Sequence, residues 1–139
     1  MGLIKHSHHA FEIDYPGKDS YELRKAGCRQ IMLSSSHRRA IIMDHRELRE
    51  PALNHELAHF DQTGLDLVLV EGFRAEPFPK IELYRRALGK ALLYPDDDMI
   101  IAIATDSPLS PIPKIPRLDL NNPGQVADFI LDEFLPRQC

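Results

Sequence analysis

The stretch Leu65-Asp66-Leu67-Val68-Leu69-Val70-Glu71-Gly72-Phe73 decides the fold. Its core, Leu67 to Val70, is an unbroken apolar run that is too short for a typical helix. Such a run predicts a strand buried on both faces, as in a parallel sheet covered by helices. Glu71 and Gly72 follow at once. A carboxylate and a glycine at a strand end are typical of a site that holds a metal or a water near a phosphate, but they also fit a strand that simply turns into solvent.

Length and composition indicate one globular domain, residues 1–139, with 43% hydrophobic and 27% charged residues. The net charge of −4 and the isoelectric point near 5.9 argue against a nucleic-acid-binding domain, which usually carries a basic excess. No apolar run is long enough to cross a membrane, and the N-terminus has no hydrophobic signal region. The two cysteines make no disulfide framework. We therefore expect a cytoplasmic protein.

The rest of the chain alternates strand and helix patterns. Short helices are predicted over 20–26 and 51–61, and a last helix is predicted after Asn122, with Pro123 at its first position. The segment 107–116 carries four prolines and must be irregular or extended. Strands are expected at Gly2–His6, Arg29–Ser34, Arg39–Met43, Lys80–Tyr84 and Met99–Ala104, of which the second and third read as a hairpin and the fourth as an edge strand. This pattern predicts an α/β fold, a mainly parallel sheet with one antiparallel hairpin.

Histidines cluster directly after the first predicted strand. His6 and His8 share a face of an extended backbone, whereas His9 points away, so two of the three could ligate one metal. A third ligand is not specified, so hydrogen bonding at a strand end and contact with a phosphate remain open alternatives.

A turn at residues 14–20 leads into the first helix. Asp19 is the expected N-cap, with Glu22 three residues later completing a capping-box-like pair. Gly17-Lys18 resembles the end of a phosphate-binding P-loop, but Glu12 stands at the earlier glycine position and Asp19 replaces the Ser or Thr. Lys18 beside a helix N-terminus still favours contact with an anion.

The helix predicted at 51–61 contains His55-Glu56-Leu57-Ala58-His59, a literal match to the zinc hydrolase pattern H-E-x-x-H. In a helix the apolar residues of this segment form one face, and both histidines lie on the opposite, solvent side. A catalytic zinc also needs a third protein ligand, and no following spacing supplies one. An exposed polar face is the better interpretation, and a zinc hydrolase remains the lesser alternative.

Three predicted strands carry polar residues at their carboxyl ends, where parallel sheets bind ligands. Lys5 and His6 end the first strand, Glu71 and Gly72 the central one, and Thr105 and Asp106 the last. A cation, a carboxylate and an aspartate able to accept guanine N–H groups suit a magnesium-bound nucleoside triphosphate. We expect Lys5 or Lys18 to meet phosphate oxygens, Glu71 to hold Mg²⁺ directly or through water, and all these groups to surround one pocket.

Four motifs together resemble the MobB family of molybdopterin-guanine dinucleotide biosynthesis adaptor proteins. They follow the family order across nearly the whole chain, the first two being the more distinctive: Gly2-Leu3-Ile4-Lys5-His6-Ser7-His8-His9, residues 16–27 from Pro16-Gly17-Lys18-Asp19 to Ala26-Gly27, residues 65–73, and Ala104-Thr105-Asp106-Ser107-Pro108. The resemblance implies a fold of the P-loop NTPase type, binding of GTP and Mg²⁺, and a homodimer. It also implies association with the molybdenum cofactor guanylyltransferase (MobA-like) and with molybdopterin-handling proteins.

The resemblance also assigns residues. Glu71 matches the acidic Walker B position, which would hold Mg²⁺, and Thr105-Asp106 matches the segment near the base. The other positions that match family motifs near the nucleotide or cofactor are Lys5, His6, Asp14, Lys18, Asp19 and Gly72. No catalytic residue follows from it, and the H-E-x-x-H segment corresponds to a packing helix.

Members of this family carry a strand, a glycine-rich G-x-x-x-x-G-K-[ST] loop and a helix before the segment that starts here at Gly2. These 139 residues contain no such loop. We therefore expect the first strand, P-loop and first helix of the fold to be missing, and GTP binding and hydrolysis to be impaired, leaving a weak GTPase at best. A non-catalytic interaction protein of the same pathway is the alternative.

Overall fold

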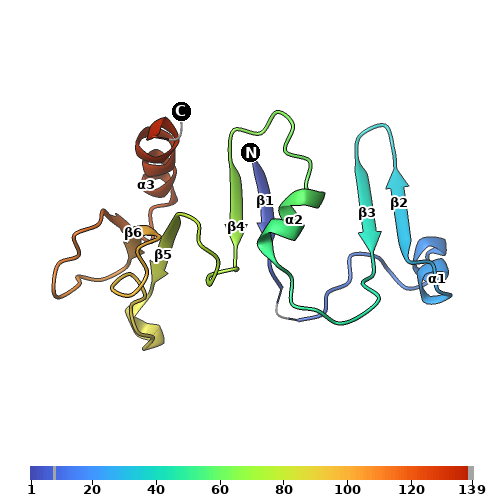
Figure 1. Cartoon of the computed structure of the whole chain (residues 1–139), viewed down its shortest axis with the longest axis horizontal. Coiled ribbons are helices and arrows are strands. Elements are labelled where there is room, and N and C mark those ends of the chain that lie inside the picture. The colour runs from blue at the N-terminus through green and yellow to red at the C-terminus, as the bar shows by residue number, and fades with distance from the viewer. Residues whose placement is uncertain (8, 138–139) are drawn as a thin grey trace. The chain divides into compact units, whose positions relative to one another are not determined.

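The computed structural model describes residues 1–7 and 9–137, which form two compact units, 1–76 and 77–139 (Figure 1). Each unit is described by itself. The α/β class, the parallel strands and the antiparallel hairpin predicted from the sequence are all present. The grouping of all residues into a single domain stays a prediction.

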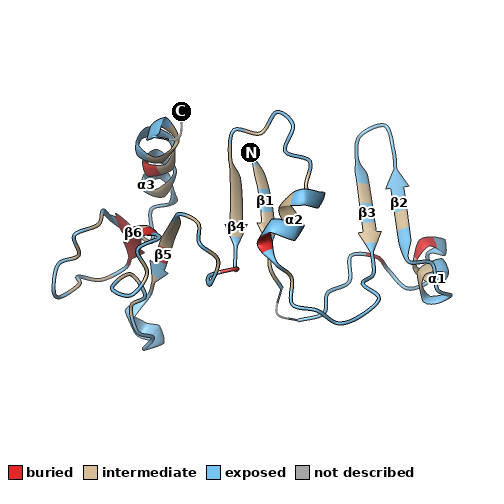
Figure 2. Cartoon of the chain, viewed as in Figure 1, coloured by how far each residue is buried: buried red, intermediate tan, exposed pale blue. Residues whose placement is uncertain are grey.

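The first unit holds a parallel strand pair. β1 (Gly2–Lys5) lies beside β4 (Val68–Glu71), with Gly2 opposite Val68 and Lys5 opposite Glu71. The predicted strand at 67–70 is confirmed, but the prediction that it is buried on both faces is wrong, because its apolar residues are only half-buried (Figure 2). In the described part of the chain β4 has one hydrogen-bonded neighbour, so less of its surface is covered than in the middle of a sheet.

Helix α2 (Leu53–His59) packs its apolar side inward, as predicted. Leu53 is buried, Leu57 and Phe60 are half-buried, and both histidines are exposed. A Cβ added at Gly2 would come within 2.6 Å of the Phe60 ring, so this ring lies directly against β1. The helix is shorter than the predicted 51–61, and Ala52 takes the extended N-cap position just before it.

The hairpin is formed by β2 (Gln30–Ser34) and β3 (Arg39–Met43) in antiparallel register, with Met32 opposite Ile41. Ser35 closes its turn by accepting hydrogen bonds from two backbone amides with its hydroxyl group. Apolar side chains remain exposed on the hairpin, including Met32 at 55% and Ile41 at 50%. Helix α1 (Asp19–Lys25) precedes it.

The second unit is built on a three-stranded parallel sheet in the order β5 (Lys80–Tyr84), β6 (Ile100–Thr105), β7 (Arg117–Asp119). β6 lies in the middle and is almost wholly buried, with Ile103 fully inaccessible to solvent. The predicted apolar strand at 99–104 and the edge position of 80–84 are therefore confirmed. A single 3₁₀ turn, Arg86–Leu88, follows β5.

The Lys-Ile-Glu-Leu-Tyr alternation of β5 predicts one buried face, and this is confirmed only in part: Ile81 packs against the core cluster, but Leu83 does not. Glu82 is buried at 8% exposure, whereas Leu83 is 69% exposed. The Glu82 carboxylate accepts hydrogen bonds from the backbone amides of Leu93 and Tyr94, at 2.8 and 2.9 Å. The loop after β5 thus supplies partners to a buried charge, which makes the burial tolerable.

The last helical segment covers this sheet. α3 (Pro123–Asp128) begins at the predicted cap, where the Asn122 side chain accepts a hydrogen bond from the Gln125 amide. A π-helical turn (Phe129–Phe134) and a 3₁₀ turn (Leu135–Arg137) continue it. Phe129 is buried in a cluster with Ala102, Ala104 and Leu118, and Val126 and Ile130 pack against it, so the apolar side of this segment lies on the sheet.

Candidate functional site

The ends of β1 and β4 bring a lysine and a glutamate together. Since the strands are parallel, their carboxyl ends lie at the same edge, and the register sets Lys5 opposite Glu71. The Lys5 ammonium and the Glu71 carboxylate form an ion pair at 2.9 Å, with both side chains 61% exposed. Both groups are reachable from solvent, and each carries its counter-charge.

Gly72 makes the tight exit from β4. Its φ angle is +91°, and a Cβ there would lie 2.7 Å from the Cβ of His6. The His6 amide donates a hydrogen bond to the Glu71 carbonyl oxygen at 2.8 Å, and the His6 ring lies 4.9 Å from the ring of buried Phe73. The end of β1 therefore passes close to the Gly72 backbone, and the residue that approaches it is His6.

Asp14 is held in a charged cluster around Arg24. Asp14 is buried; its Oδ1 accepts a hydrogen bond from the Tyr15 amide, and its Oδ2 is buried without a hydrogen-bond partner. Arg24, on α1, forms ion pairs with Glu12 and with Asp44, and its side chain is only 9% exposed. The hydrogen bond that Arg24 donates to the Glu12 carboxylate, reinforced by the charges of Glu12, Asp44 and Asp14, raises the pKa of Arg24.

Arg24 is therefore the residue that holds residues 12–14 and the end of β3 against α1, and sequence analysis missed it. The helix pattern predicts where Arg24 lies on α1 but not its partners, because these come from two other segments of the chain.

Lys18 and Asp19 lie at the start of α1 and are exposed. The predicted N-cap at Asp19 is wrong: Lys18 occupies that position, and the Asp19 carboxylate accepts a hydrogen bond from the Ser20 amide. Glu22 reaches back as predicted, but it accepts from the Gly17 amide at 3.2 Å. The helix starts one residue earlier than expected, so Asp19 and Glu22 accept hydrogen bonds from other amides than a cap at Asp19 would give them.

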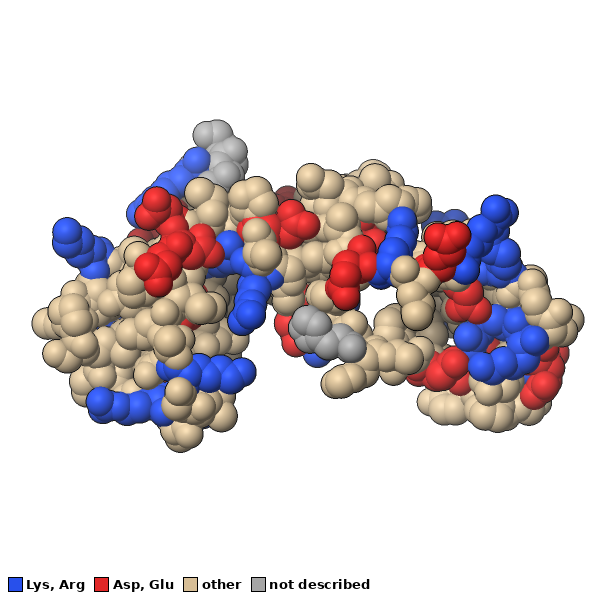
Figure 3. Space-filling model, turned by 60° about the horizontal axis from the view of Figure 1, so that its bottom comes forward, with Lys and Arg blue, Asp and Glu red and all other residues tan. Residues whose placement is uncertain are grey.

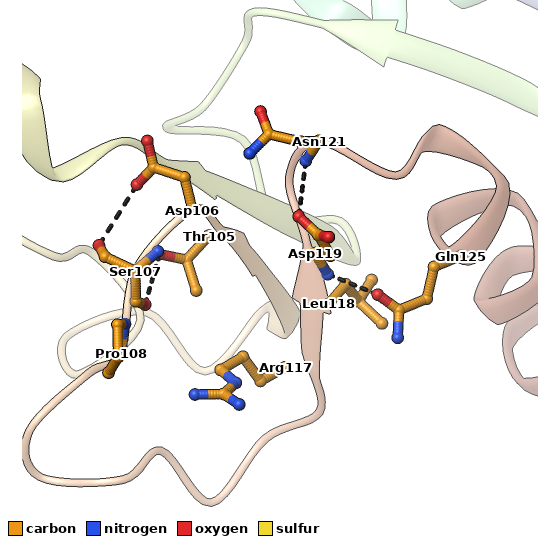
Figure 4. A pocket seen from close by; sticks show the side chains of 9 residues that line it. All are labelled: Thr105, Asp106, Ser107, Pro108, Arg117, Leu118, Asp119, Asn121 and Gln125. Atoms are coloured by element: carbon orange, nitrogen blue, oxygen red, sulfur yellow. Dashed lines mark hydrogen bonds between the residues drawn. The ribbon is translucent and has the colours of Figure 1, made fainter.

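The second unit carries an open pocket of about 450 Å³ at the carboxyl ends of β6 and β7 (Figure 4). Thr105 is buried there; its hydroxyl donates to the Ser107 carbonyl oxygen and accepts from the Ser107 amide. This closes a tight turn that places Asp106 at the pocket. The lining residues come from the β6 end, from β7 and from the start of α3: Thr105, Asp106, Ser107, Pro108, Arg117, Leu118, Asp119, Asn121 and Gln125.

Two carboxylates line this pocket. Asp106 forms an ion pair with Arg85 at 3.0 Å and accepts a further hydrogen bond from the Ser107 hydroxyl. Asp119 accepts from the Asn121 amide through one oxygen, and its own amide donates to the Gln125 side chain. Sequence analysis missed Asp119, although the short β7 runs parallel to β6 and so ends beside it.

The structure thus brings Lys5, His6, Glu71 and Gly72 together in the first unit, and Thr105 and Asp106 in the second. Asp14, Lys18 and Asp19 contact the segments around α1 instead. The expectation that all these residues surround one pocket involves residues of both units, and it stays a prediction.

The two histidine motifs differ in how much the structure describes of them. His8 lies outside the described residues, so the predicted pairing of His6 with His8 is not addressed. His55 and His59 are exposed, as expected. Within residues 1–7 and 9–137, no group of three or more His, Cys, Asp or Glu side chains is arranged to hold a metal ion.

Charged side chains of both signs lie interspersed on the face drawn in Figure 3, in keeping with the absence of a basic excess in the composition. In the described part of the chain no helix is long and apolar enough to cross a membrane.

The chain is similar in sequence to proteins of known name. Residues 1–106 match the family model MobB, molybdopterin guanine dinucleotide synthesis protein B. The molybdopterin-guanine dinucleotide biosynthesis adapter protein of Haemophilus influenzae is 43% identical over 134 residues, which cover 94% of this chain and 70% of the relative. The protein with the same name in Escherichia coli is 41% identical, with 94% and 74% covered.

Solved structures share the fold. The crystal structure of a MobB homolog from Bacillus stearothermophilus matches with a TM-score of 0.65 at 21% identity, covering 98% of this chain and 78% of that one. Bacillus subtilis MobB matches with a TM-score of 0.63 at 22% identity, covering 94% and 77%.

Proposed function

This chain belongs to the MobB family, molybdopterin guanine dinucleotide synthesis protein B, and on that basis we propose that it is an adapter in molybdopterin-guanine dinucleotide biosynthesis that binds a guanine nucleotide. The adapter role rests on the named relatives. The nucleotide part rests on one observation, the pocket at the carboxyl ends of β6 and β7 with its two carboxylates.

The chemistry of this pocket fits a guanine base. Guanine presents N–H donors at N1 and N2, and a carboxylate accepts both in a bidentate manner. Asp119 has one oxygen engaged by a backbone amide, and Asp106 shares its carboxylate with Arg85 and Ser107. Adenine presents an acceptor at N1, so the same carboxylates disfavour it. The pocket residues therefore favour guanine over adenine.

The strand-end cluster of the first unit, taken by itself, carries groups suited to a phosphate and a magnesium ion. Mg²⁺ prefers oxygen ligands and usually keeps waters and substrate phosphates around one or two carboxylates, so Glu71 alone is a sufficient protein ligand. Lys5 beside it is an exposed cation suited to phosphate oxygens. When bound, magnesium would neutralise phosphate charge; the chain's own part is to supply the Glu71 oxygen and to hold Lys5 next to it.

Binding by these 139 residues is expected to be weak, because they contain no glycine-rich loop to donate backbone N–H groups to the phosphates. Saturation-transfer NMR suits weak ligands. We expect the guanine H8 signal of GTP to receive transfer from the protein, and the adenine signals of ATP to receive clearly less. Asp119→Asn should lower the guanine signal, and Glu133→Gln, an exposed carboxylate on the last helical segment, should not.

Equal transfer to GTP and ATP, or an Asp119→Asn signal equal to that of the parent chain, would contradict the base assignment. Nanomolar GTP affinity with ordinary turnover would contradict the expectation of weak binding.

A non-catalytic interaction protein of the same pathway is the second candidate. It is favoured by the ion pairs Lys5–Glu71 and Arg85–Asp106, which satisfy the site charges without any ligand. Absence of any GTP transfer, together with capture of a MobA-like guanylyltransferase by the chain, would favour this candidate. Association with molybdopterin-handling proteins and a cytoplasmic location stay predictions.

We further propose that the chain forms a homodimer through the β2–β3 hairpin. Its strands pair only with each other in the described chain, and its apolar side chains remain exposed. Ile41→Glu should therefore yield a monomer in sedimentation velocity runs. Leu48→Glu places the same charge on another exposed leucine and should leave the dimer intact. A dimer that survives Ile41→Glu would remove the hairpin from the interface.

A further inference from the structure

The exposed side of α2 carries a histidine pair that the proposed function does not use. His55 and His59 are four residues apart, which places them on one face of the helix. Their ring centroids are 4.4 Å apart, and the ring planes are tilted by 33°. The two imidazoles therefore stand side by side at the surface.

The hydrogen bond of His59 fixes which nitrogen carries its proton. Its Nδ1 lies 2.8 Å from the backbone carbonyl oxygen of His55, and a carbonyl oxygen only accepts. Nδ1 must therefore donate, which leaves the lone pair on Nε2. A ligating histidine commonly has this arrangement, with one ring nitrogen donating to a carbonyl oxygen and the other binding the metal.

His55 has an acidic and a basic neighbour. Its Nδ1 lies 3.4 Å from Glu56 Oε1, an acceptor, and its Nε2 lies 3.5 Å from one Arg49 guanidinium nitrogen, a donor. The second guanidinium nitrogen of Arg49 lies 3.2 Å from Nδ1. The guanidinium group of Arg49 therefore has a donor within 3.5 Å of each ring nitrogen. Whichever nitrogen of His55 carries the lone pair, an Arg49 donor faces it in place of a metal.

We propose that His55 and His59 form a two-histidine site for a borderline divalent cation, Zn²⁺, Ni²⁺ or Cu²⁺, and that Arg49 competes with the cation for His55. Imidazole nitrogens suit these metals at about 2.0–2.1 Å, whereas Mg²⁺ and Ca²⁺ prefer oxygen. Histidines four residues apart on one helix face can bind the same ion. Water completes the coordination, so this is a binding site and not the three-ligand site of a hydrolase.

The test is titration of the untagged 139-residue chain with NiCl₂, followed by isothermal calorimetry. We expect saturable binding of one ion. His55→Gln and His59→Gln should each lower the affinity at least tenfold, since loss of a direct ligand costs no less than the roughly 10- to 100-fold known for loss of an outer partner. His9→Gln removes an exposed histidine elsewhere and should leave the affinity unchanged.

Arg49→Gln should change the nickel affinity in the opposite direction. Removing a cation a few ångströms from the ion should raise the affinity about two- to fivefold, a gain that a misfolded variant would not show. MgCl₂ in place of NiCl₂ should give no heat from this site.

Nickel binding that survives both histidine substitutions overturns the proposal, as does its loss in His9→Gln. An Arg49→Gln affinity equal to or below that of the parent chain overturns the competition. These outcomes are independent of GTP binding, because none of these residues belongs to the proposed nucleotide sites.

Discussion

Replacing Gly72 by alanine tests the geometry on which the strand-end cluster depends. The backbone at Gly72 has φ +91°, a conformation that costs an L-residue about 1–2 kcal/mol. The added Cβ would also lie 2.7 Å from the Cβ of His6, far inside the usual carbon–carbon separation of about 3.5–4.0 Å. A Cβ moves only with its backbone, so relief requires β1 and β4 to separate. Forced overpacking of this kind typically costs about 1–3 kcal/mol.

Two other glycines separate these contributions. Gly17 has φ +87°, nearly the same angle, but a Cβ there would meet nothing within 4 Å. Gly17→Ala therefore carries the backbone strain alone, about 1–2 kcal/mol. Gly2 has no positive φ, but its added Cβ would meet the Phe60 ring at 2.6 Å, so Gly2→Ala carries a contact that side-chain movement can partly relieve. The loss of unfolded-chain entropy is common to all three substitutions and cancels in their differences.

The measured quantity is the free energy of unfolding from urea titrations followed by far-UV circular dichroism. Native-state hydrogen exchange at Ile4 and Val70 localises the change to the β1–β4 pair. We expect Gly72→Ala to lose about 2–5 kcal/mol, which is about 1–3 kcal/mol more than Gly17→Ala. Equal losses in the two variants would show that the His6 contact is relieved freely, and the argument for a rigid strand end would fail.

Further predictions concern the second unit. Glu82→Leu should cost roughly 3–6 kcal/mol in the same urea titration, because it removes two hydrogen bonds to a carboxylate at about 1.5–3 kcal/mol each; a smaller loss would mean that water replaces the carboxylate. Asn122→Ala removes the side-chain cap of α3 and should cost about 1 kcal/mol, whereas Asn122→Asp should retain most of the stability. The hydrogen bond from Lys80 lowers the pKa of Asp97 from its ordinary value of 3.8. The folded state then binds the proton less readily than the unfolded state, so this stabilisation is present above about pH 4 and is lost as the pH falls through the lowered pKa. Acid titration of Asp97→Asn should lack that component.

Much of the fold could be predicted from patterns of residues that are close together in the sequence. The Asn-Pro-x-Gln pattern places its own cap at Asn122, and the hairpin strands pair with near neighbours in sequence, so both were predictable. Burial was harder to predict, because it depends on distant segments. Leu67–Val70 and Met99–Ala104 are equally apolar, yet only the second is covered, since β6 has a strand on either side and α3 above it.

In the candidate site, too, some features could be predicted from the sequence and others depend on distant segments. Lys5 and Glu71 could be placed together because parallel strands end at a common edge, a rule that needs no side-chain detail. The partners of Arg24 come from two other segments, and the pocket position of Asp119 depends on a three-residue strand that has no pattern of its own. Residues held by such non-local contacts give no signal in the linear sequence.

The pairing of charges bears directly on how tightly a nucleotide can bind. Lys5 meets Glu71 and Arg85 meets Asp106 before any ligand arrives. Exposed ion pairs are typically worth about 0–1 kcal/mol, so a ligand can replace them at little cost, but it also gains little from charges that were already neutralised. Net affinity must then come from groups with no competing partner, such as the backbone N–H donors of a phosphate-binding loop. These 139 residues contain no such loop, so we expect the proposed guanine nucleotide to bind weakly.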